Sequence, residues 1–147
     1  LARETPCAPP PTAAVAPSPA GGRPAVGARQ LPPPAGGIAW IRAAGGVAVL
    51  AHPTWAKVPG EGLSTLLTAL KAGGLGGIEV HYSTHTKRQT TEYLDLAKRL
   101  DLLITGGSDF HGLTKPDIEV GTGLGNLKVS EKLLVTLKKA DSHAHHS

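Results

Sequence analysis

Cysteine and long apolar runs are almost absent from this 147-residue chain. Its one cysteine, Cys7, excludes a disulfide framework and a cysteine-ligated zinc site, and it fits a reducing compartment. No run approaches the ~18 apolar residues of a membrane span. Residues 1–36 also lack the positively charged start and apolar centre of a secretory signal. The composition therefore predicts a cytoplasmic protein without a membrane partner.

A block of basic residues is also missing. The net charge is only +4 at neutral pH, and the 15 Lys and Arg residues are spread along the chain. This distribution excludes a dense basic surface for duplex DNA, but a mild positive excess suits a small anionic substrate. Methionine is absent as well, and the chain begins with Leu1. We therefore expect a fragment or a processed product of a longer protein.

Proline divides the chain into unequal parts. Ten of the 13 prolines lie in residues 1–36, together with many Ala and Gly residues. Proline removes backbone donors, and Ala and Gly offer little surface to bury, so this segment is predicted to be disordered. Residues 37–140 carry the foldable sequence. The end, 141–147, is expected to be a frayed tail whose histidines bind metal ions only adventitiously.

Hydrophobic periodicity predicts alternating strands and helices from residue 37 onward. Continuous apolar runs indicate strands at 47–51, 77–81 and 102–105. Apolar residues at helical spacing indicate a short helix before Gly45, a second with Leu63, Leu66, Leu67 and Leu70 on one face, a third over about 86–100 with Tyr93, Leu96, Ala97 and Leu100 buried, and a last one capped by Ser130 with Leu133, Leu134 and Leu137 on one stripe. Strands separated by helices are predicted to be parallel, in an open α/β sheet or in part of a barrel.

Potential metal ligands follow the predicted strands, at the edge where parallel α/β folds collect functional groups. Asp109 and His111 come after the third strand, and in an extended segment both side chains point to one side. A carboxylate with a neutral imidazole suits manganese, iron or zinc. The alternative is that Ser108 and Asp109 simply cap a turn.

His52 and Glu79 lie at the first two strands. His52 precedes Pro53, which disfavours helical backbone, so His52 is expected to be extended and to act as a further ligand or as a packed histidine. Glu79 shares one strand face with His81. If buried there, its carboxylate needs a cation, an imidazole or several hydrogen bonds; on an edge strand it would face solvent.

Three further basic side chains are candidate contacts for a phosphate group. His85 and Arg88 flank the start of the third predicted helix, and Lys115 follows the Asp109–His111 pair. Each of them could equally be a solvated surface residue.

Three segments, in this order, make the sequence recognisable: GGVAVLAHP at 45–53, GGIEV with STHT at 76–86, and GGSDFHG at 106–112. Over about residues 38–140 they resemble the carboxyl-terminal half of bacterial PHP-domain (polymerase and histidinol phosphatase) phosphoesterases. The resemblance is to the branch that contains nucleoside 3′,5′-bisphosphate phosphatases and 5′-3′ exoribonucleases acting on short RNA.

The resemblance implies an α/β fold, a partial distorted (β/α)7 PHP barrel with about three carboxyl-terminal βα units. His52, Asp109 and His111 match metal ligands, Glu79 a position near the site, and His85 a substrate or phosphate contact. The implied cofactors are divalent ions, Mn²⁺ first and Fe²⁺ or Zn²⁺ as alternatives. The implied substrate is a phosphorylated nucleotide or short RNA, attacked by a metal-activated hydroxide.

The chain departs from that pattern because no His-x-His pair precedes its first predicted strand. We therefore expect this chain to be incomplete and inactive by itself, with exposed strand edges that favour self-association. Two alternatives stay open: a non-catalytic PHP remnant or interaction module, and an amidohydrolase-type barrel.

Overall fold

The computed structural model describes residues 32–58 and 61–144, with side chains as far as residue 140. The elements in chain order are α1 (Pro34–Ala43), β1 (Val49–Leu50), the 3-10 helix η2 (Pro53–Ala56), α2 (Glu61–Ala72), β2 (Gly77–Tyr82), α3 (Lys87–Arg99), β3 (Leu103–Gly107), the 3-10 helix η3 (Gly112–Thr114) and α4 (Glu131–Ala144). Among the described residues, no helix combines the length and the apolar composition needed to cross a membrane.

Both predicted ends of the folded region differ from the structure. Helix α1 begins at Pro34, inside the segment predicted to be disordered, because proline suits the first turn of a helix, where its missing N–H has no partner to lose. Helix α4 continues to Ala144, into the predicted tail. The rest of these two predicted segments, residues 1–31 and 145–147, lies outside the described residues.

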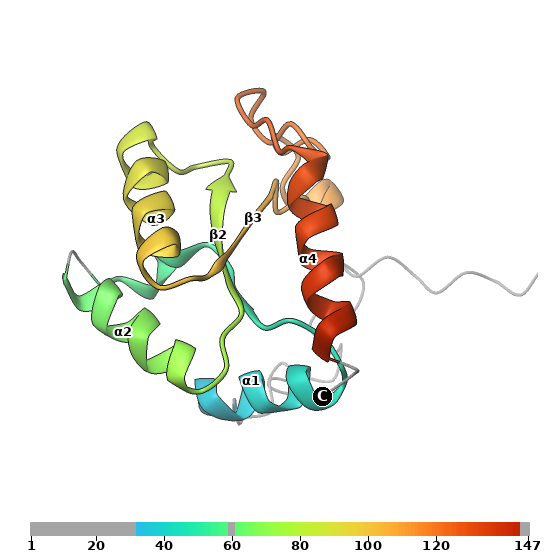
Figure 1. Ribbon diagram of the computed structural model, residues 1–147. Helices are drawn as coiled ribbons and strands as arrows, with labels where there is room; N and C mark the ends of the chain where they lie inside the picture. The colour runs from blue at the N-terminus through green and yellow to red at the C-terminus, as the bar shows by residue number, and fades with distance from the viewer. Residues whose placement is uncertain (1–31, 59–60, 145–147) are drawn as a thin grey trace, which may run out of the picture. The chain divides into compact units, whose positions relative to one another are not determined.

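The three strands form a parallel sheet in the order β1-β2-β3, so the prediction of parallel strands joined by helices is confirmed (Figure 1). β2 is central. β1 is shorter than the predicted 47–51, because only Val49 and Leu50 pair with β2 before the chain turns at His52. Within the described chain the outer edges of β1 and β3 are unpaired. A barrel therefore remains a prediction.

A β-bulge interrupts the pairing of β2 with β3. Glu79 pairs with Thr105 and His81 with Gly106, so Val80 is an extra residue on β2. The strands approach closely at this point: a Cβ on Gly106 would lie 2.7 Å from the His81 Cβ atom. Glycine is therefore required at position 106.

The hydrophobic core lies between β2 and the helices α1, α2 and α3. Leu63 and Leu67 of α2 are buried, with Leu66 and Leu70 packed against the core, as the leucine spacing predicts. The predicted buried face of α3 is also confirmed; its innermost members are Tyr93, Leu96 and Ala97. These helices pack against β2, whose carboxyl end carries residues of the candidate site.

Helix α4 packs on β3 but adds nothing to this core. Ser130 caps it as predicted, because its Oγ accepts a hydrogen bond from the Lys132 backbone N–H at 3.3 Å. Of the expected apolar stripe, Leu133 and Leu137 are only half-buried, and Leu134 is 49% exposed. The view in Figure 1 shows α3 and α4 on either side of β3. The sheet side next to α4 is thus the less covered one.

Candidate metal-binding site

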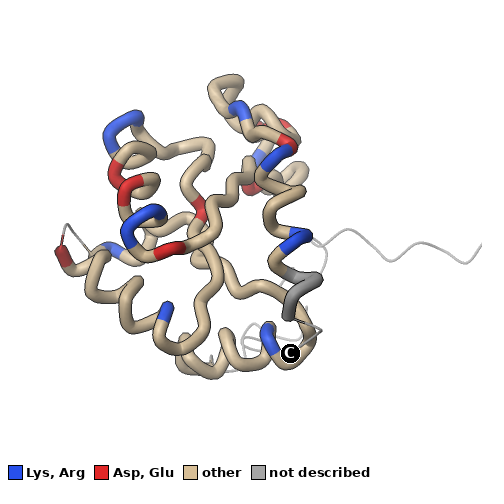
Figure 2. Tube along the Cα trace, viewed as in Figure 1, with Lys and Arg blue, Asp and Glu red and all other residues tan. Residues whose placement is uncertain are grey.

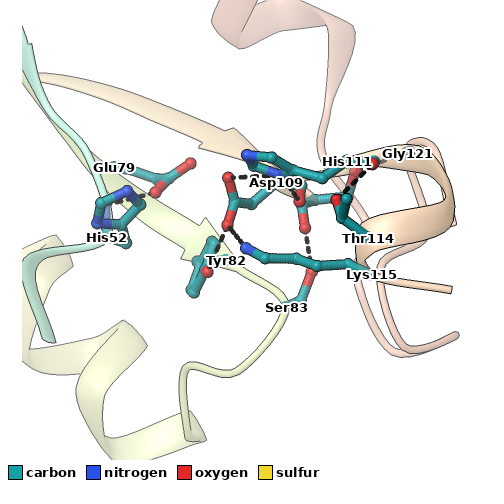
Figure 3. Close-up of polar contacts among 10 residues, drawn as sticks. His52, Glu79, Tyr82, Ser83, Asp109, His111, Thr114, Lys115 and Gly121 are labelled. Atoms are coloured by element: carbon teal, nitrogen blue, oxygen red, sulfur yellow. Dashed lines mark hydrogen bonds and ion pairs between the residues drawn. The ribbon is translucent and has the colours of Figure 1, made fainter. Parts of the chain in front are cut away.

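The candidate residues gather where the strands end (Figure 3). His52 follows β1, Glu79 and Tyr82 belong to β2, and Asp109 and His111 follow β3. On β2 the residues Glu79 and His81 are half-buried, whereas their neighbours Ile78 and Val80 are buried. The predicted common face for Glu79 and His81 is therefore confirmed.

Asp109 is the centre of the polar contacts. Its Oδ2 atom accepts a hydrogen bond from the Tyr82 hydroxyl at 3.0 Å and forms an ion pair with the Lys115 ammonium group. The bond from Lys115 lowers the pKa of Asp109; burial acts in the opposite direction, and the Tyr82 bond lowers the pKa further. Asp109 is therefore a carboxylate that already has a cation beside it.

The extended backbone predicted for Asp109 is wrong. Its φ of 58° lies in the left-handed region, which Asp tolerates better than most residues. His111 nevertheless comes close: its Nδ1 atom lies 2.8 Å from the Asp109 carbonyl oxygen and 3.4 Å from Oδ1. A turn, rather than an extended segment, brings the pair together. With the proton on Nδ1, the Nε2 atom of this half-exposed ring offers a lone pair.

His52 is also left-handed, with φ 30° and ψ 64°, so the predicted extended conformation is wrong. Pro53 disfavours only the right-handed helical region at the preceding residue, and the Glu79 carboxylate stabilises this turn from another strand. The His52 backbone N–H donates to Glu79 Oε2 at 2.6 Å. The His52 ring lies 5.8 Å from the Tyr82 ring between centroids.

Glu79 is half-buried, and the His52 amide is its hydrogen-bond partner in the described chain. Burial raises the pKa of Glu79, and the hydrogen bond from His52 opposes that shift. Gly107 leaves room for the carboxylate, since a Cβ there would lie 3.3 Å from Glu79 Oε1. Glu79 thus ties β1 to β2 and adds negative charge near Asp109.

His85 packs on Tyr82, with ring centroids 5.1 Å apart. Its Nδ1 atom is 2.9 Å from the Val80 carbonyl oxygen, its ring packs on Tyr93, and its Nε2 atom is buried without a hydrogen-bond partner in the described chain. Burial lowers the pKa of His85, which favours the neutral form of the ring. A histidine that donates Nδ1–H to a carbonyl and leaves Nε2 open has the arrangement of a metal ligand.

The other two predicted phosphate contacts differ in position. Lys115 is in the site, on Asp109. Arg88 instead lines a surface hollow with Glu92 and Asp95 of the same helix, away from the contacts of Asp109.

The sequence analysis did not predict the hydrogen bonds that support the backbone next to Asp109. The Ser83 hydroxyl donates to the Ser108 carbonyl oxygen at 2.9 Å, and the Asn126 amide donates to the Ser83 carbonyl oxygen at 3.2 Å. Gly123 packs directly on Ser83: a Cβ there would lie 2.9 Å from the Ser83 Cβ atom and closer still to Oγ. The alternating glycines at 121, 123 and 125 were the sequence signal for this loop. Glycine is favoured where the backbone needs a positive φ, and all three residues have one.

The donor types fit a transition-metal ion, but their number does not complete a site. Within the described residues, no three His, Cys, Asp or Glu side chains come close enough together to hold one ion. Asp109 and His111 form a pair, the open Nε2 atom of His85 is a further donor, and Lys115 already occupies the Asp109 carboxylate.

Known proteins resemble this chain over part of its length. It is 39% identical over 74 residues to a 5′-3′ exoribonuclease of Haemophilus influenzae and 33% identical over 84 residues to a 3′,5′-nucleoside bisphosphate phosphatase of Chromobacterium violaceum. A solved structure assigned as a metal-dependent phosphoesterase from Bifidobacterium adolescentis superposes with a TM-score of 0.57, at 33% identity, over 72% of this chain and 36% of that one. The resemblance to PHP-type phosphoesterases is confirmed.

A third relative, at 46% identity over 69 residues, is a phosphoribosyl 1,2-cyclic phosphate 1,2-diphosphodiesterase of Eggerthella lenta. The matches cover 46–57% of this chain but only 24–30% of the curated relatives. No protein-family model matches the chain. The likeness to PHP-type phosphoesterases therefore concerns a part of those proteins.

Proposed function

We propose that this chain is the carboxyl-terminal part of a PHP-type phosphoesterase that hydrolyses phosphate esters of nucleotides or short RNA with a divalent metal ion, Mn²⁺ first and Fe²⁺ or Zn²⁺ as alternatives. The observation that carries the proposal is the contact of Asp109 with His111 and Tyr82 after β3. Relatives that act on nucleotide or RNA phosphates support the substrate class.

Each residue has a role that its contacts support. Asp109 and His111 would hold the ion, together with His52 and the open nitrogen of His85 after rearrangement of the loops. The bound ion supplies an activated hydroxide and neutralises the phosphoryl oxygens. Tyr82 orients the Asp109 carboxylate through its hydroxyl, and Lys115 places a positive charge where a phosphate oxygen would approach.

We further propose that the three strands belong to a larger barrel and that this chain alone is inactive. The described residues offer too few converging donors for a complete site. A PHP remnant without catalysis is the alternative, and the ion pair between Lys115 and Asp109 favours it, since the ammonium group satisfies the carboxylate without metal.

A Mn²⁺ titration followed by electron paramagnetic resonance tests the proposal. The 147-residue chain should carry alanine at His143, His145 and His146, which removes adventitious binding by the end of the chain. We expect about one weakly bound ion per chain, lost in Asp109→Asn and kept in Asp95→Asn, a matched loss of one carboxylate on the exposed face of α3.

The same samples are then assayed for hydrolysis of adenosine 3′,5′-bisphosphate. Binding that Asp109→Asn leaves unchanged, or no binding by the parent chain, contradicts the metal site and favours the non-catalytic remnant. Hydrolysis by this chain alone contradicts the proposal that it is inactive.

A further inference from the structure

Aromatic side chains are scarce in this chain, and they are concentrated near the candidate site. The sequence has two Trp, two Tyr and one Phe residue, all of them among the described residues. Three of these five lie in the site or next to it in the chain: Trp55, Tyr82 and Phe110. The Trp55 side chain is 65% exposed. Single exposed apolar residues are common on protein surfaces, so the position of Trp55 must indicate its role.

The backbone fixes Trp55 beside His52. Trp55 lies in the 3-10 helix η2, and its N–H donates to the His52 carbonyl oxygen at 2.9 Å. In a 3-10 helix, side chains three residues apart lie on the same side. The Trp55 and His52 rings accordingly lie 5.5 Å apart between centroids, tilted by 50°. Pro53, which is buried, holds the turn between them in place.

A short row of side chains connects Trp55 to the candidate site. The His52 ring lies next to the Trp55 ring on one side and 5.8 Å from the Tyr82 ring, between centroids, on another. The Tyr82 hydroxyl donates to Asp109, as Figure 3 shows. His52 is thus both a proposed ligand of the ion and the neighbour of Trp55. A nucleotide whose phosphate lies at the ion has its base, one ribose away, within reach of the indole.

The charge of this segment also suits an anionic ligand. Residues 32–58, which contain Trp55, include no Asp or Glu, and their two charged side chains are the basic Arg42 and Lys57 (Figure 2). Lys57 directly follows η2, two residues after Trp55. A nucleotide that places its base on the indole therefore meets no like charge from this part of the chain.

We propose that Trp55 binds the nucleobase of the substrate by stacking. Every nucleobase has an aromatic face, and stacking on an aromatic side chain is a strong contact that tolerates any base. The inference rests on the proposed function and deepens it: phosphate esters that carry a base bind in preference to base-free sugar phosphates. Another polypeptide is the alternative occupant of the exposed indole, and the two occupants differ in whether a free nucleotide affects Trp55.

Nuclear magnetic resonance of the two indole N–H groups tests the inference without metal, in EDTA. The chain has two tryptophans, and the variants Trp40→Phe and Trp55→Phe assign their signals. Adenosine 5′-monophosphate is the probe, and ribose 5-phosphate is the matched ligand without a base. We expect adenosine 5′-monophosphate to shift the Trp55 signal in a saturable way, and ribose 5-phosphate to leave that signal in place.

Trp40 is the matched control, because its side chain is 67% exposed. It belongs to α1, whose Arg42 packs on Gly74 just before β2 begins, at the end of the strand away from the site. Its signal should stay unchanged. The affinity for adenosine 5′-monophosphate follows from the shifts of the backbone amide signals. Trp55→Ala should weaken it at least about fivefold, the lower end of what one stacked base contributes, and Trp40→Ala should leave it unchanged.

The inference is overturned if the Trp55 signal does not respond, as expected of an indole that contacts another polypeptide instead. It is also overturned if both indole signals respond alike, if ribose 5-phosphate acts as well as the nucleotide, or if Trp55→Ala keeps the affinity of the parent chain. A failure of the proposed function appears instead as absent Mn²⁺ binding, or as binding that Asp109→Asn leaves unchanged, with the response of Trp55 in EDTA intact.

Discussion

Gly123→Ala tests whether the glycine loop supports the candidate site. Gly123 has a φ of 60° and packs on the buried Ser83, whose hydroxyl donates to the backbone of Ser108 next to Asp109. A methyl group at position 123 must displace the Ser83 side chain. We expect loss of stability and a disturbed Asp109 turn.

The size of the loss follows from two contributions. A non-glycine residue in the left-handed region costs about 1–2 kcal/mol. Forcing a methyl group into the packed contact with Ser83, where its Cβ would lie 2.9 Å from the Ser83 Cβ atom, adds about 1–3 kcal/mol. Gly121→Ala is the matched control, because Gly121 has a φ of 77° but no atom within 4 Å of an added Cβ. The Gly121→Ala variant should therefore lose only the about 1–2 kcal/mol that the left-handed backbone costs.

Urea denaturation of both variants and the parent chain measures the difference. Gly123→Ala should be less stable than Gly121→Ala by about 1–3 kcal/mol, or about 4–12 °C in Tm for a folded region of roughly this size. Equal losses in the two variants would refute the packing of Gly123 on Ser83.

Three further predictions concern the polar groups, all in metal-free buffer. Burial raises the pKa of Glu79, so the parent chain should lose stability as pH rises from 4.5 through the folded-state pKa; urea denaturation against pH should show no such loss in Glu79→Gln. Lys115 lowers the pKa of Asp109, so the parent chain should lose stability as pH falls below 3.8 toward the folded-state pKa. The Lys115→Gln variant should lose less stability over that interval. The same loss in the variant and the parent chain would contradict the ion pair. Tyr82→Phe removes a donor to Asp109 and should raise the pKa of that carboxyl in a ¹³C NMR titration, whereas a constant value would contradict the hydrogen bond.

Local patterns predicted the fold well. The leucine spacing in α2 and the apolar face of α3 determine which sides of these helices are buried, and they depend on neighbours three or four residues apart. Alternation also placed Glu79 and His81 on one face of β2. Helix α4 was less predictable, because how deeply Leu134 is buried depends on what covers β3, not on its own spacing.

The geometry of the site depends on contacts that sequence spacing does not show. The left-handed backbone of His52 accompanies a hydrogen bond to Glu79, 27 residues away. The ion pair of Lys115 with Asp109 closes a turn that pattern reasoning had treated as extended. Residue types at the strand ends thus predicted that Asp109 and His111 lie together, but not the left-handed backbone that brings them into contact.

The β-bulge at Val80 restricts how this strand can change length during evolution. Deletion of Val80 would place His81 directly after Glu79 in a regular ladder with β3, and because successive side chains point to opposite faces, the imidazole would turn toward the apolar core. A one-residue gap here, unlike one in an exposed loop, would bury a polar ring. Among related sequences, gaps should therefore avoid β2.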